Sequence, residues 1–411
     1  GDLFTARQKL SLVTLSQIVA NLSDGSVKSS IACTVSRCAD YWSSGVLWAQ
    51  EGEFVAHTFG RQALPIVWDF AETVPWTETS GNFDGAVDWV SRVIEAYPKS
   101  PAVGQVQLAD APNVPLPDNT CGVWFTDPPY YDAIPYADIS DFFFVWLKRI
   151  MNDHRFTRDP FDPSNPLTPK HSELTVTTVE GKEFRPKTRD FFESGLTDAF
   201  VEGLRILRED GVGCVIFAHK TTEGWEAFLS ALINGGWTIG GSWPISTERR
   251  GRLNALETAA LASSIHLICR PRHEDAPIGD WGDVLRELPK RVGDWMERLQ
   301  SEGIRGADLV FACIGPALEI YSRYSKVVDA EEREIPLGGD PEALEPHRRG
   351  FLSYVWEVVG RTALEHVLGT AEAKARNSTA GALEEDARLT ALFLWTLQST
   401  NGNGTKGAKE E

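Results

Sequence analysis

The stretch CGVWFTDPPY, residues 121–130, decides the fold class of this chain. Its first part, residues 121–126, is apolar or small and predicts a strand. Asp127 and then Pro128-Pro129 follow at once, and a proline both fixes φ and lacks the N–H that a strand needs. The stretch therefore predicts a strand that stops at a rigid, acid-bearing turn, with the aromatic ring of Tyr130 beside it.

Helix and strand patterns alternate around this turn. Apolar spacing of three and four predicts helices over residues 138–151, 188–207 and 223–234, and buried apolar runs predict strands over 106–109, 211–218, 237–244 and 261–269. This alternation predicts an α/β fold with a mostly parallel sheet covered by helices on both faces. Ligands of such sheets bind beyond the carboxyl ends of the strands, where Asp110, Asp127 and His219-Lys220 fall.

The two ends of the chain are predicted to be helical. Helical spacing occurs over residues 6–22, 30–49, 61–71 and 83–97, and again from 280 to 400, before a polar tail. Residues 153–186 are rich in proline, threonine and charge, and are expected to form a long functional loop or a partly ordered insertion. We therefore predict a helical segment over 1–100, an α/β core over 101–272 and a helical region over 273–411.

The composition is that of a soluble globular protein. Of the 411 residues, 42% are hydrophobic and 24% are charged, and no stretch reaches the length of a membrane span or opens the chain as a secretory signal. The six cysteines form no CxxC pair, so no metal site is predicted and a reducing, cytoplasmic location is expected.

The Asp127 turn suits one chemistry, the methylation of an exocyclic amine on a nucleobase that has been flipped out of its helix. Such an amine is a poor nucleophile because its lone pair is delocalised into the ring. A carboxylate and a backbone carbonyl that accept its two hydrogens would make the lone pair available, and a tyrosine face would stack on the base. The alternative is a strand-to-loop exit in which the prolines only end the strand.

The charge balance bears on a nucleic-acid partner. A net charge of −18 is unusual for a protein that binds phosphates, because such surfaces are basic. Two local basic clusters, Arg249–Arg252 and Arg270–Arg272, are candidates either for phosphate contacts or for solvated loops.

Residues 126–138, TDPPYYDAIPYAD, resemble the catalytic motif of the large adenine-specific DNA methylases, a family with an N-terminal domain of unknown function and a zinc ribbon. The resemblance to this family extends to about residue 325. Shorter segments that are similar to the family are residues 4–8, 61–70, 109–111, 217–220, 260–264 and 314–319. The resemblance implies a Rossmann-like methyltransferase sheet that uses S-adenosylmethionine. It also implies a DNA adenine N6-methyltransferase, in a restriction-modification or phage-defence setting.

The resemblance assigns a role to each matching residue. Asp127 and the Pro128 carbonyl would accept from the target amine, Pro129 would complete the rigid turn, and Tyr130 would stack on the adenine. Asp110 matches a position that contacts the adenine moiety of S-adenosylmethionine. The alternative to this cofactor contact is that Asp110 is only a turn residue at the end of a strand.

Six further residues would contact the substrate or shape the loop over the base. They are Tyr131, Asp132, Tyr136, Asp138, His219 and Lys220. The alternatives are that His219 is a histidine whose hydrogen bonds are all made within the protein, and that Lys220 is a surface lysine.

The chain departs from the family where the cofactor should bind. It has no early strand followed by a glycine-rich turn, no second strand ending in an acid for the ribose, and no zinc-ribbon cysteines. It also opens with Gly1 rather than methionine, which fits a fragment or a processed product. We therefore expect an incomplete sheet, and a partner polypeptide that supplies the cofactor-binding half and a basic surface for DNA.

Two other classes of function stay open. One is a methyltransferase that acts on another amine or amide, in cytosine, RNA or protein; aspartate at the first motif position favours adenine within the family. The other is a non-catalytic scaffold that binds partners through its aromatic-rich helical segment.

Overall fold

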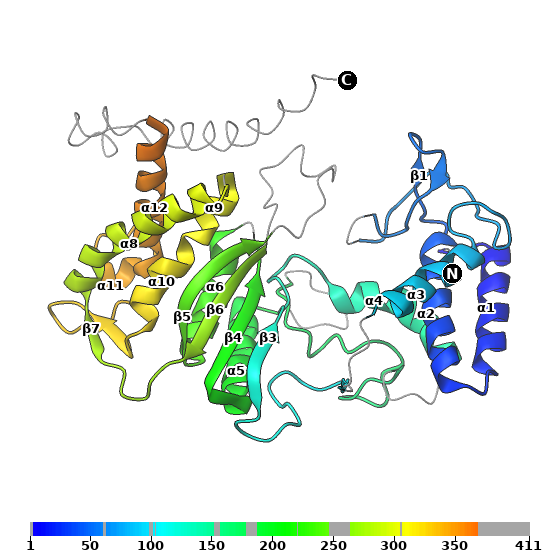
Figure 1. The fold of residues 1–411 in the computed structure, drawn as a ribbon, viewed down its shortest axis with the longest axis horizontal. Coiled ribbons are helices and arrows are strands. Elements are labelled where there is room, and N and C mark those ends of the chain that lie inside the picture. The colour runs from blue at the N-terminus through cyan, green and yellow to red at the C-terminus, as the bar shows by residue number, and fades with distance from the viewer. Residues whose placement is uncertain are drawn as a thin grey trace. The chain divides into compact units, whose positions relative to one another are not determined.

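The computed structural model describes most of the chain (Figure 1). The described residues are 3–60, 63–97, 102, 104–151, 157–177, 187–219, 221–245, 264–304 and 306–368. Contacts divide the chain into two compact units, the first formed by Gly1–Ala109 and Ile134–Glu173, the second by Asp110–Ala133 and Leu174–Glu411. The predicted boundaries near residues 100 and 272 therefore do not separate the packed units.

The first unit is a helical cluster with one small antiparallel strand pair. Its elements are α1 (Ala6–Ala20), α2 (Gly25–Tyr41), β1 (Trp48–Ala49), β2 (Phe54–Val55), α3 (Phe83–Ala96) and α4 (Tyr136–Ile150). Helix α1 begins at a capping box in which Thr5 and Gln8 satisfy each other's backbone N–H groups. Helix α4 joins this unit because Phe142, Trp146 and Ile150, each four residues apart, form one apolar stripe.

The helix predictions for this unit are largely confirmed. Helices α1 and α3 lie within the predicted ranges, and α4 begins two residues early, at Tyr136. The helix predicted over residues 30–49 is only partly right, because α2 ends at Tyr41 and residues 48–49 form β1. The helix predicted over residues 61–71 is wrong, because the described residues 63–71 form no helix. Leu64, Ile66 and Trp68 of that segment are exposed, so its apolar spacing buries nothing.

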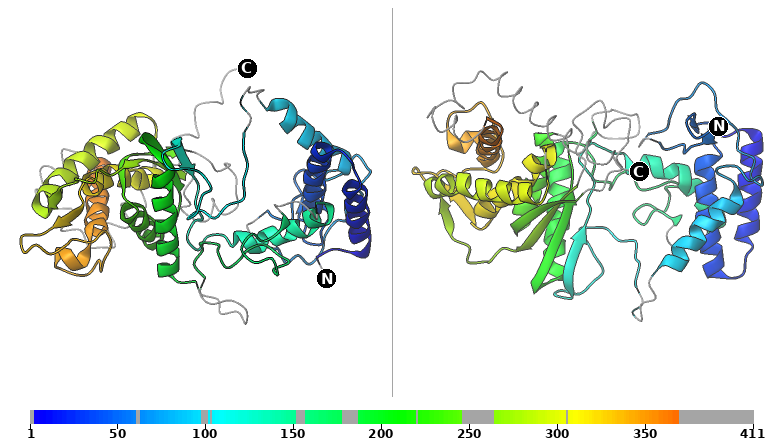
Figure 2. Two further views of the ribbon diagram at one scale, coloured as in Figure 1. Left: turned by 90° about the horizontal axis from the view of Figure 1, so that it is seen from below. Right: turned by 45° about the horizontal axis from the view of Figure 1, so that its top comes forward.

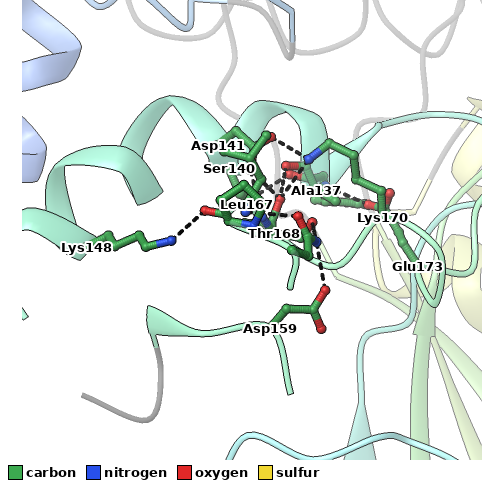
Figure 3. A network of polar contacts seen from close by, with 12 residues as sticks. Ala137, Ser140, Asp141, Lys148, Asp159, Leu167, Thr168, Lys170 and Glu173 are labelled. Carbon is green, nitrogen blue, oxygen red and sulfur yellow. Dashed lines mark hydrogen bonds and ion pairs between the residues drawn. The ribbon is translucent and has the colours of Figure 1, made fainter. Parts of the chain in front are cut away.

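A polar network ties the loop after α4 back onto that helix (Figure 3). Thr168 donates from its N–H and from its hydroxyl to Asp141 Oδ1, at 2.9 and 2.6 Å, and Lys170 pairs with the other carboxylate oxygen. The α4 backbone also takes part, since the Ala137 N–H donates to Glu173 at 2.8 Å. The described residues 157–173, predicted as part of a long loop or insertion, are thus fixed by charge-assisted bonds.

Asp141 is expected to make the stability of the first unit depend on pH. Burial raises the pKa of Asp141, but the hydrogen bonds from Lys170 and Thr168 outweigh burial and hold it below the ordinary 3.8. A carboxyl group whose pKa is lower in the folded state than in the unfolded state stabilises the fold at pH values above the unfolded-state pKa. This stabilisation is lost as the pH falls through the folded-state pKa. We expect the denaturant midpoint of the unit, followed by near-ultraviolet circular dichroism, to fall below about pH 4.

The Asp141→Asn variant is expected to have a lower midpoint at neutral pH and a shallower fall in acid. Asp84→Asn, at an exposed acid of α3, is the matched control and should follow the wild type. An unchanged acid profile in Asp141→Asn would contradict the assignment.

The second unit is built on a four-stranded sheet in the order β3-β4-β6-β5. Its strands are β3 (Cys121–Thr126), β4 (Leu207–Phe217), β5 (Trp237–Ile245) and β6 (Ser264–Pro271). Helices α5 (Arg189–Ile206) and α6 (Thr222–Asn234) lie on one face, behind the sheet in Figure 1. The α/β class predicted from the sequence is confirmed.

The sheet differs from the prediction in two respects. Strands β3 and β4 pair in parallel, but β6 runs antiparallel to both of its neighbours, so the sheet is mixed rather than mostly parallel. Residues 106–109, predicted as a strand, have no regular structure. A strand needs a hydrogen-bonded neighbour, and none of the described strands pairs with this run.

Aromatic side chains fill the core between the sheet and its two helices. Phe217 of β4 stacks on Phe228 of α6, with ring centroids 4.0 Å apart. Trp237 of β5 stacks on Trp124 of β3, with ring centroids 5.1 Å apart, and donates from Nε1 to the Phe200 carbonyl at 3.0 Å. This ring links the sheet to α5.

The C-terminal elements pack into the same core. They are β7 (Ile278–Asp280), α8 (Trp281–Ser301), α9 (Gly306–Ala312), α10 (Ile314–Ser322), β8 (Lys326–Val328), α11 (Pro346–Arg349) and α12 (Phe351–Leu368). The parallel pair β7–β8 was not predicted. Helix α10 packs along β5, and the Ile239 N–H of β5 donates to Ser322 Oγ at 3.0 Å. Figure 2 shows α8 to α10 beside β5, with β3 at the other edge of the sheet.

None of the helices in the described residues has the length and apolar character needed to cross a membrane.

Candidate functional site

The Asp127 turn lies at the carboxyl end of β3, an edge strand of the sheet. Asp127 is exposed and Pro128 is buried, so the carboxylate lies outside the core while the proline behind it is packed. Within the described residues, no hydrogen-bond donor reaches the Asp127 carboxylate or the Pro128 carbonyl. The turn therefore presents two neighbouring acceptors that have no donor among the described residues.

Tyr130 lies beside these acceptors. Its half-buried ring packs edge-on against Phe217 of β4, with centroids 5.5 Å apart and planes at 73°. Its carbonyl accepts from the Ala133 N–H at 2.9 Å. The ring is thus held by the core.

The next residue, Tyr131, has a strained backbone. Its φ is +53°, in the left-handed region that a bulky side chain rarely adopts. Its carbonyl accepts from the Val176 N–H at 3.0 Å, and its N–H donates to the Pro129 carbonyl at 3.2 Å. These bonds reverse the chain directly after the two prolines and keep the turn compact.

The Tyr131 side chain anchors the turn to α5 and α6. Its hydroxyl donates to Glu223 Oε1 at 2.8 Å, and its ring packs edge-on against Phe192 at 5.1 Å and His219 at 5.6 Å. Burial, and then the bond to Glu223, raise the pKa of Tyr131 above its ordinary 10.0. Because the ring is 5% exposed, this residue supports the turn from within, and its burial disfavours the predicted contact with substrate.

His219 supports the turn from the end of β4. Its Nδ1 accepts from the Thr221 N–H at 3.2 Å, so the ring proton is assigned to Nε2, which donates to Asp132 Oδ1 at 2.9 Å. Trp225 Nε1 donates to the His219 carbonyl at 2.9 Å. His219 is 4% exposed, which fits the satisfied histidine considered above better than a contact with substrate.

Asp110 is not brought to the turn. Its carbonyl accepts from the Asn113 N–H at 3.0 Å, and the following loop is tied to the last turns of α5 by the Val114 N–H, which donates to Glu202 at 2.7 Å. Helix α5 ends where β4 begins, and Leu207 pairs with Cys121. The loop is therefore held at the end of the sheet where β3 starts, whereas Asp127 follows the end of β3.

The structure does not bring the two other predicted contacts to the turn. Tyr136 begins α4 in the first unit, with a ring 41% exposed. Lys220 lies outside the described residues, as does the basic cluster Arg249–Arg252.

The second basic cluster is partly structural. Arg272 donates to the Ile233 carbonyl at 3.2 Å and to the Tyr324 carbonyl at 3.5 Å, and burial lowers its pKa. Of the two alternatives for this cluster, phosphate contact is therefore disfavoured at Arg272, while Arg270 is exposed.

Sequence reasoning did not identify Glu223 as part of this site, and it gave Asp132 only a role in shaping the loop over the base. Asp132 lies within the quoted motif, and Glu223 is an acid in the first turn of α6, where an acid is also explained by the helix dipole. Their partners lie 87 and 92 residues away along the chain, so no local pattern connects them. Within the described residues no group of three or more His, Cys, Asp or Glu side chains could hold a metal ion.

The Tyr131→Phe variant should show how much the anchor stabilises the second unit. It keeps the ring but removes the hydroxyl, and leaves Glu223 without its donor. We expect the free energy of unfolding to fall by about 1–2 kcal/mol, measured by denaturant titration. Tyr97→Phe, at a ring 75% exposed, is the matched control and should change nothing measurable; equal losses in the two variants would argue against the anchor.

Comparison with known proteins finds no relative of this chain. No family model matches the chain, and neither the curated proteins nor the solved structures contain a significant match.

Proposed function

We propose that this chain is the base-binding and amine-activating half of an S-adenosylmethionine-dependent DNA adenine N6-methyltransferase. The observation that carries the proposal is a pair of acceptors without a donor among the described residues, the Asp127 carboxylate and the Pro128 carbonyl, three and two positions before Tyr130 in the same turn. An adenine amine has two hydrogens to donate and one lone pair that must attack. Two acceptors on adjacent residues of a rigid turn match the two hydrogens.

The turn acts by position and by charge. Accepting both hydrogens draws the nitrogen toward a tetrahedral shape and concentrates its lone pair, and the carboxylate stabilises positive charge that develops on the nitrogen. The Pro128 carbonyl is held in place before the base arrives, because Pro128 is buried and the following turn is bonded to the rest of the unit. Tyr130 offers a face on which a flipped adenine would stack.

The position of the turn also supports the proposal. Ligands of α/β sheets bind beyond the carboxyl ends of parallel strands, and β3 and β4 are parallel. The Asp127 turn and His219 end these two strands and are joined through Asp132.

The described residues do not fit a complete site for S-adenosylmethionine. No glycine-rich turn follows a strand next to β3 among them, and Asp110 is held toward the other end of β3. The methyl donor would therefore be bound by a partner polypeptide, which would also bring positive charge to the DNA. This chain would contribute the acceptors and the stacking face.

The test is transfer of a labelled methyl group from S-adenosylmethionine to DNA. The chain is assayed alone and with a candidate partner polypeptide that carries a glycine-rich cofactor-binding turn, and the DNA is then hydrolysed to its bases. We expect label in N6-methyladenine only when both polypeptides are present. Label in N4-methylcytosine would move the proposal to a cytosine enzyme, and no transfer to DNA in either assay would refute it.

A further inference from the structure

The turn after β3 contacts one short part of the chain, the junction where β4 ends and α6 begins. Three successive residues of the turn each contact one residue of this junction, and the pairs are Tyr130–Phe217, Tyr131–Glu223 and Asp132–His219. The first contact is apolar and the other two are hydrogen bonds. The junction of β4 and α6 therefore sets the geometry of the turn, together with β3.

The Tyr131 backbone needs such support. Its φ of +53° is costly for a residue with a side chain, and such a conformation persists only where the surrounding contacts hold it. Hydrogen bonds close the turn on both sides of this residue, from the Tyr131 N–H to the Pro129 carbonyl and from the Ala133 N–H to the Tyr130 carbonyl. A change in this φ would redirect the chain within the turn and move the carbonyls before it.

His219 is built to hold Asp132 in one orientation. The His219 side chain is 3% exposed, and its Nδ1 accepts from the Thr221 N–H at 3.2 Å and lies 2.9 Å from the Thr221 hydroxyl. That hydroxyl accepts from the Gly224 N–H and caps α6, so its own proton points to Nδ1. The ring proton is therefore on Nε2, which donates to Asp132 Oδ1 at 2.9 Å.

The start of α6 also holds the imidazole ring in place. A Cβ added at Gly224 would collide with the ring, so only glycine allows the helix to come this close. Trp225 Nε1 donates to the His219 carbonyl at 2.9 Å, which fixes the backbone of the same residue. The donor to Asp132 is thus held before any ligand binds.

We propose that His219 is a positioning residue, which acts through Asp132. By binding the Asp132 carboxylate it holds Tyr131 in the left-handed conformation, and so fixes the direction of the Pro128 carbonyl. The position requires the hydrogen bond and does not require the negative charge of Asp132. The effect on the turn stands on the contacts above, and only its consequence for methyl transfer rests on the proposed function.

The first experiment measures amide hydrogen exchange in the free, full-length chain. Asp132→Ala removes the acceptor for His219, whereas Asp132→Asn keeps an oxygen that can accept from Nε2. The Asp132 side chain is 54% exposed, so both variants are expected to fold, which a thermal unfolding curve checks. Asp198→Ala, at an exposed aspartate of α5 in the same unit, is the matched control.

We expect the Tyr131 and Ala133 amides to exchange about tenfold faster in Asp132→Ala, and near the wild-type rate in Asp132→Asn and the control. His219→Phe should show the same increase, and combining it with Asp132→Ala should add nothing, because both changes remove one bond. Unchanged exchange in Asp132→Ala would overturn the proposal, and so would additive effects in the double variant.

The second experiment repeats the methyl-transfer assay with the candidate partner polypeptide. We expect kcat to fall about tenfold to 100-fold in Asp132→Ala, the usual effect of a small misplacement of reacting groups. The KM for DNA should change little, because the stacking face of Tyr130 is held separately by Phe217. Asp132→Asn should recover most of the loss, and equal losses in the two variants would assign the effect to charge and overturn the proposal.

The two experiments separate this inference from the proposed function. Faster exchange in Asp132→Ala, with no methyl transfer by the wild type, supports the positioning of the turn and refutes the methyltransferase. Methyl transfer by the wild type that Asp132→Ala leaves unchanged supports the methyltransferase and overturns the positioning role.

Discussion

Asp127→Ala is expected to lower methyl transfer to DNA by about 100-fold to 1,000-fold, the usual effect of removing one preorganised polar group that stabilises developing charge. The side chain is exposed and has no hydrogen-bonded partner among the described residues, so its loss should leave the fold intact. The measurement is the rate of label transfer at saturating DNA, together with a thermal unfolding curve.

Two further variants sharpen this result. Asp127→Asn keeps one acceptor oxygen but loses the negative charge, so its rate should fall between those of the wild type and the alanine variant. Asp198→Ala, at an exposed aspartate of α5, is the matched control and should retain full activity. If Asp127→Ala and Asp198→Ala transfer methyl groups equally well, Asp127 has no part in the chemistry.

Trp237→Ala is expected to have the largest effect on stability, a loss of about 3–5 kcal/mol in the free energy of unfolding of the second unit. The Trp237 side chain is fully buried, stacks on Trp124 and donates to the Phe200 carbonyl. Its ring also fills the space above Gly213 of β4. Truncation would therefore leave a cavity where β3, β4 and α5 meet, and would remove the hydrogen bond from Nε1 to the Phe200 carbonyl.

The matched control is Trp68→Ala, because Trp68 is fully exposed and its loss removes no packing. Trp237→Phe should lie between the two, since it keeps most of the ring but loses the Nε1 donor. Denaturant titration followed by near-ultraviolet circular dichroism gives the three values. A loss of under about 1 kcal/mol in Trp237→Ala would contradict the packing described above.

The parts of the fold that were predictable from sequence are those with a local cause. Strand β3 and its end were predicted because an apolar run meets two prolines, and α5 and α6 because their apolar residues repeat at helical spacing. The run over 106–109 has the same local appearance as a short strand. It failed because a strand also requires a neighbour, and pairing is not encoded in the run itself.

The direction of β6 was not predictable from local pattern. Its apolar residues would suit a strand of either direction, and the antiparallel pairing is set by its neighbours β4 and β5. The site shows the same limit. Asp127 could be identified from its own stretch, whereas the support that Tyr131 receives from Glu223 depends on two segments 92 residues apart.

The hydrogen bond from the Val176 N–H to the Tyr131 carbonyl has a mechanical consequence. The chain leaves the second unit at Ala133 and returns to it at Leu174, with α4 and its loop between these points. The bond joins the segment that leaves the second unit to the segment that returns to it, close to the two points where the chain crosses between the units. Tension carried along either of these two segments would therefore load this bond and the Tyr131 anchor before it could displace Asp127.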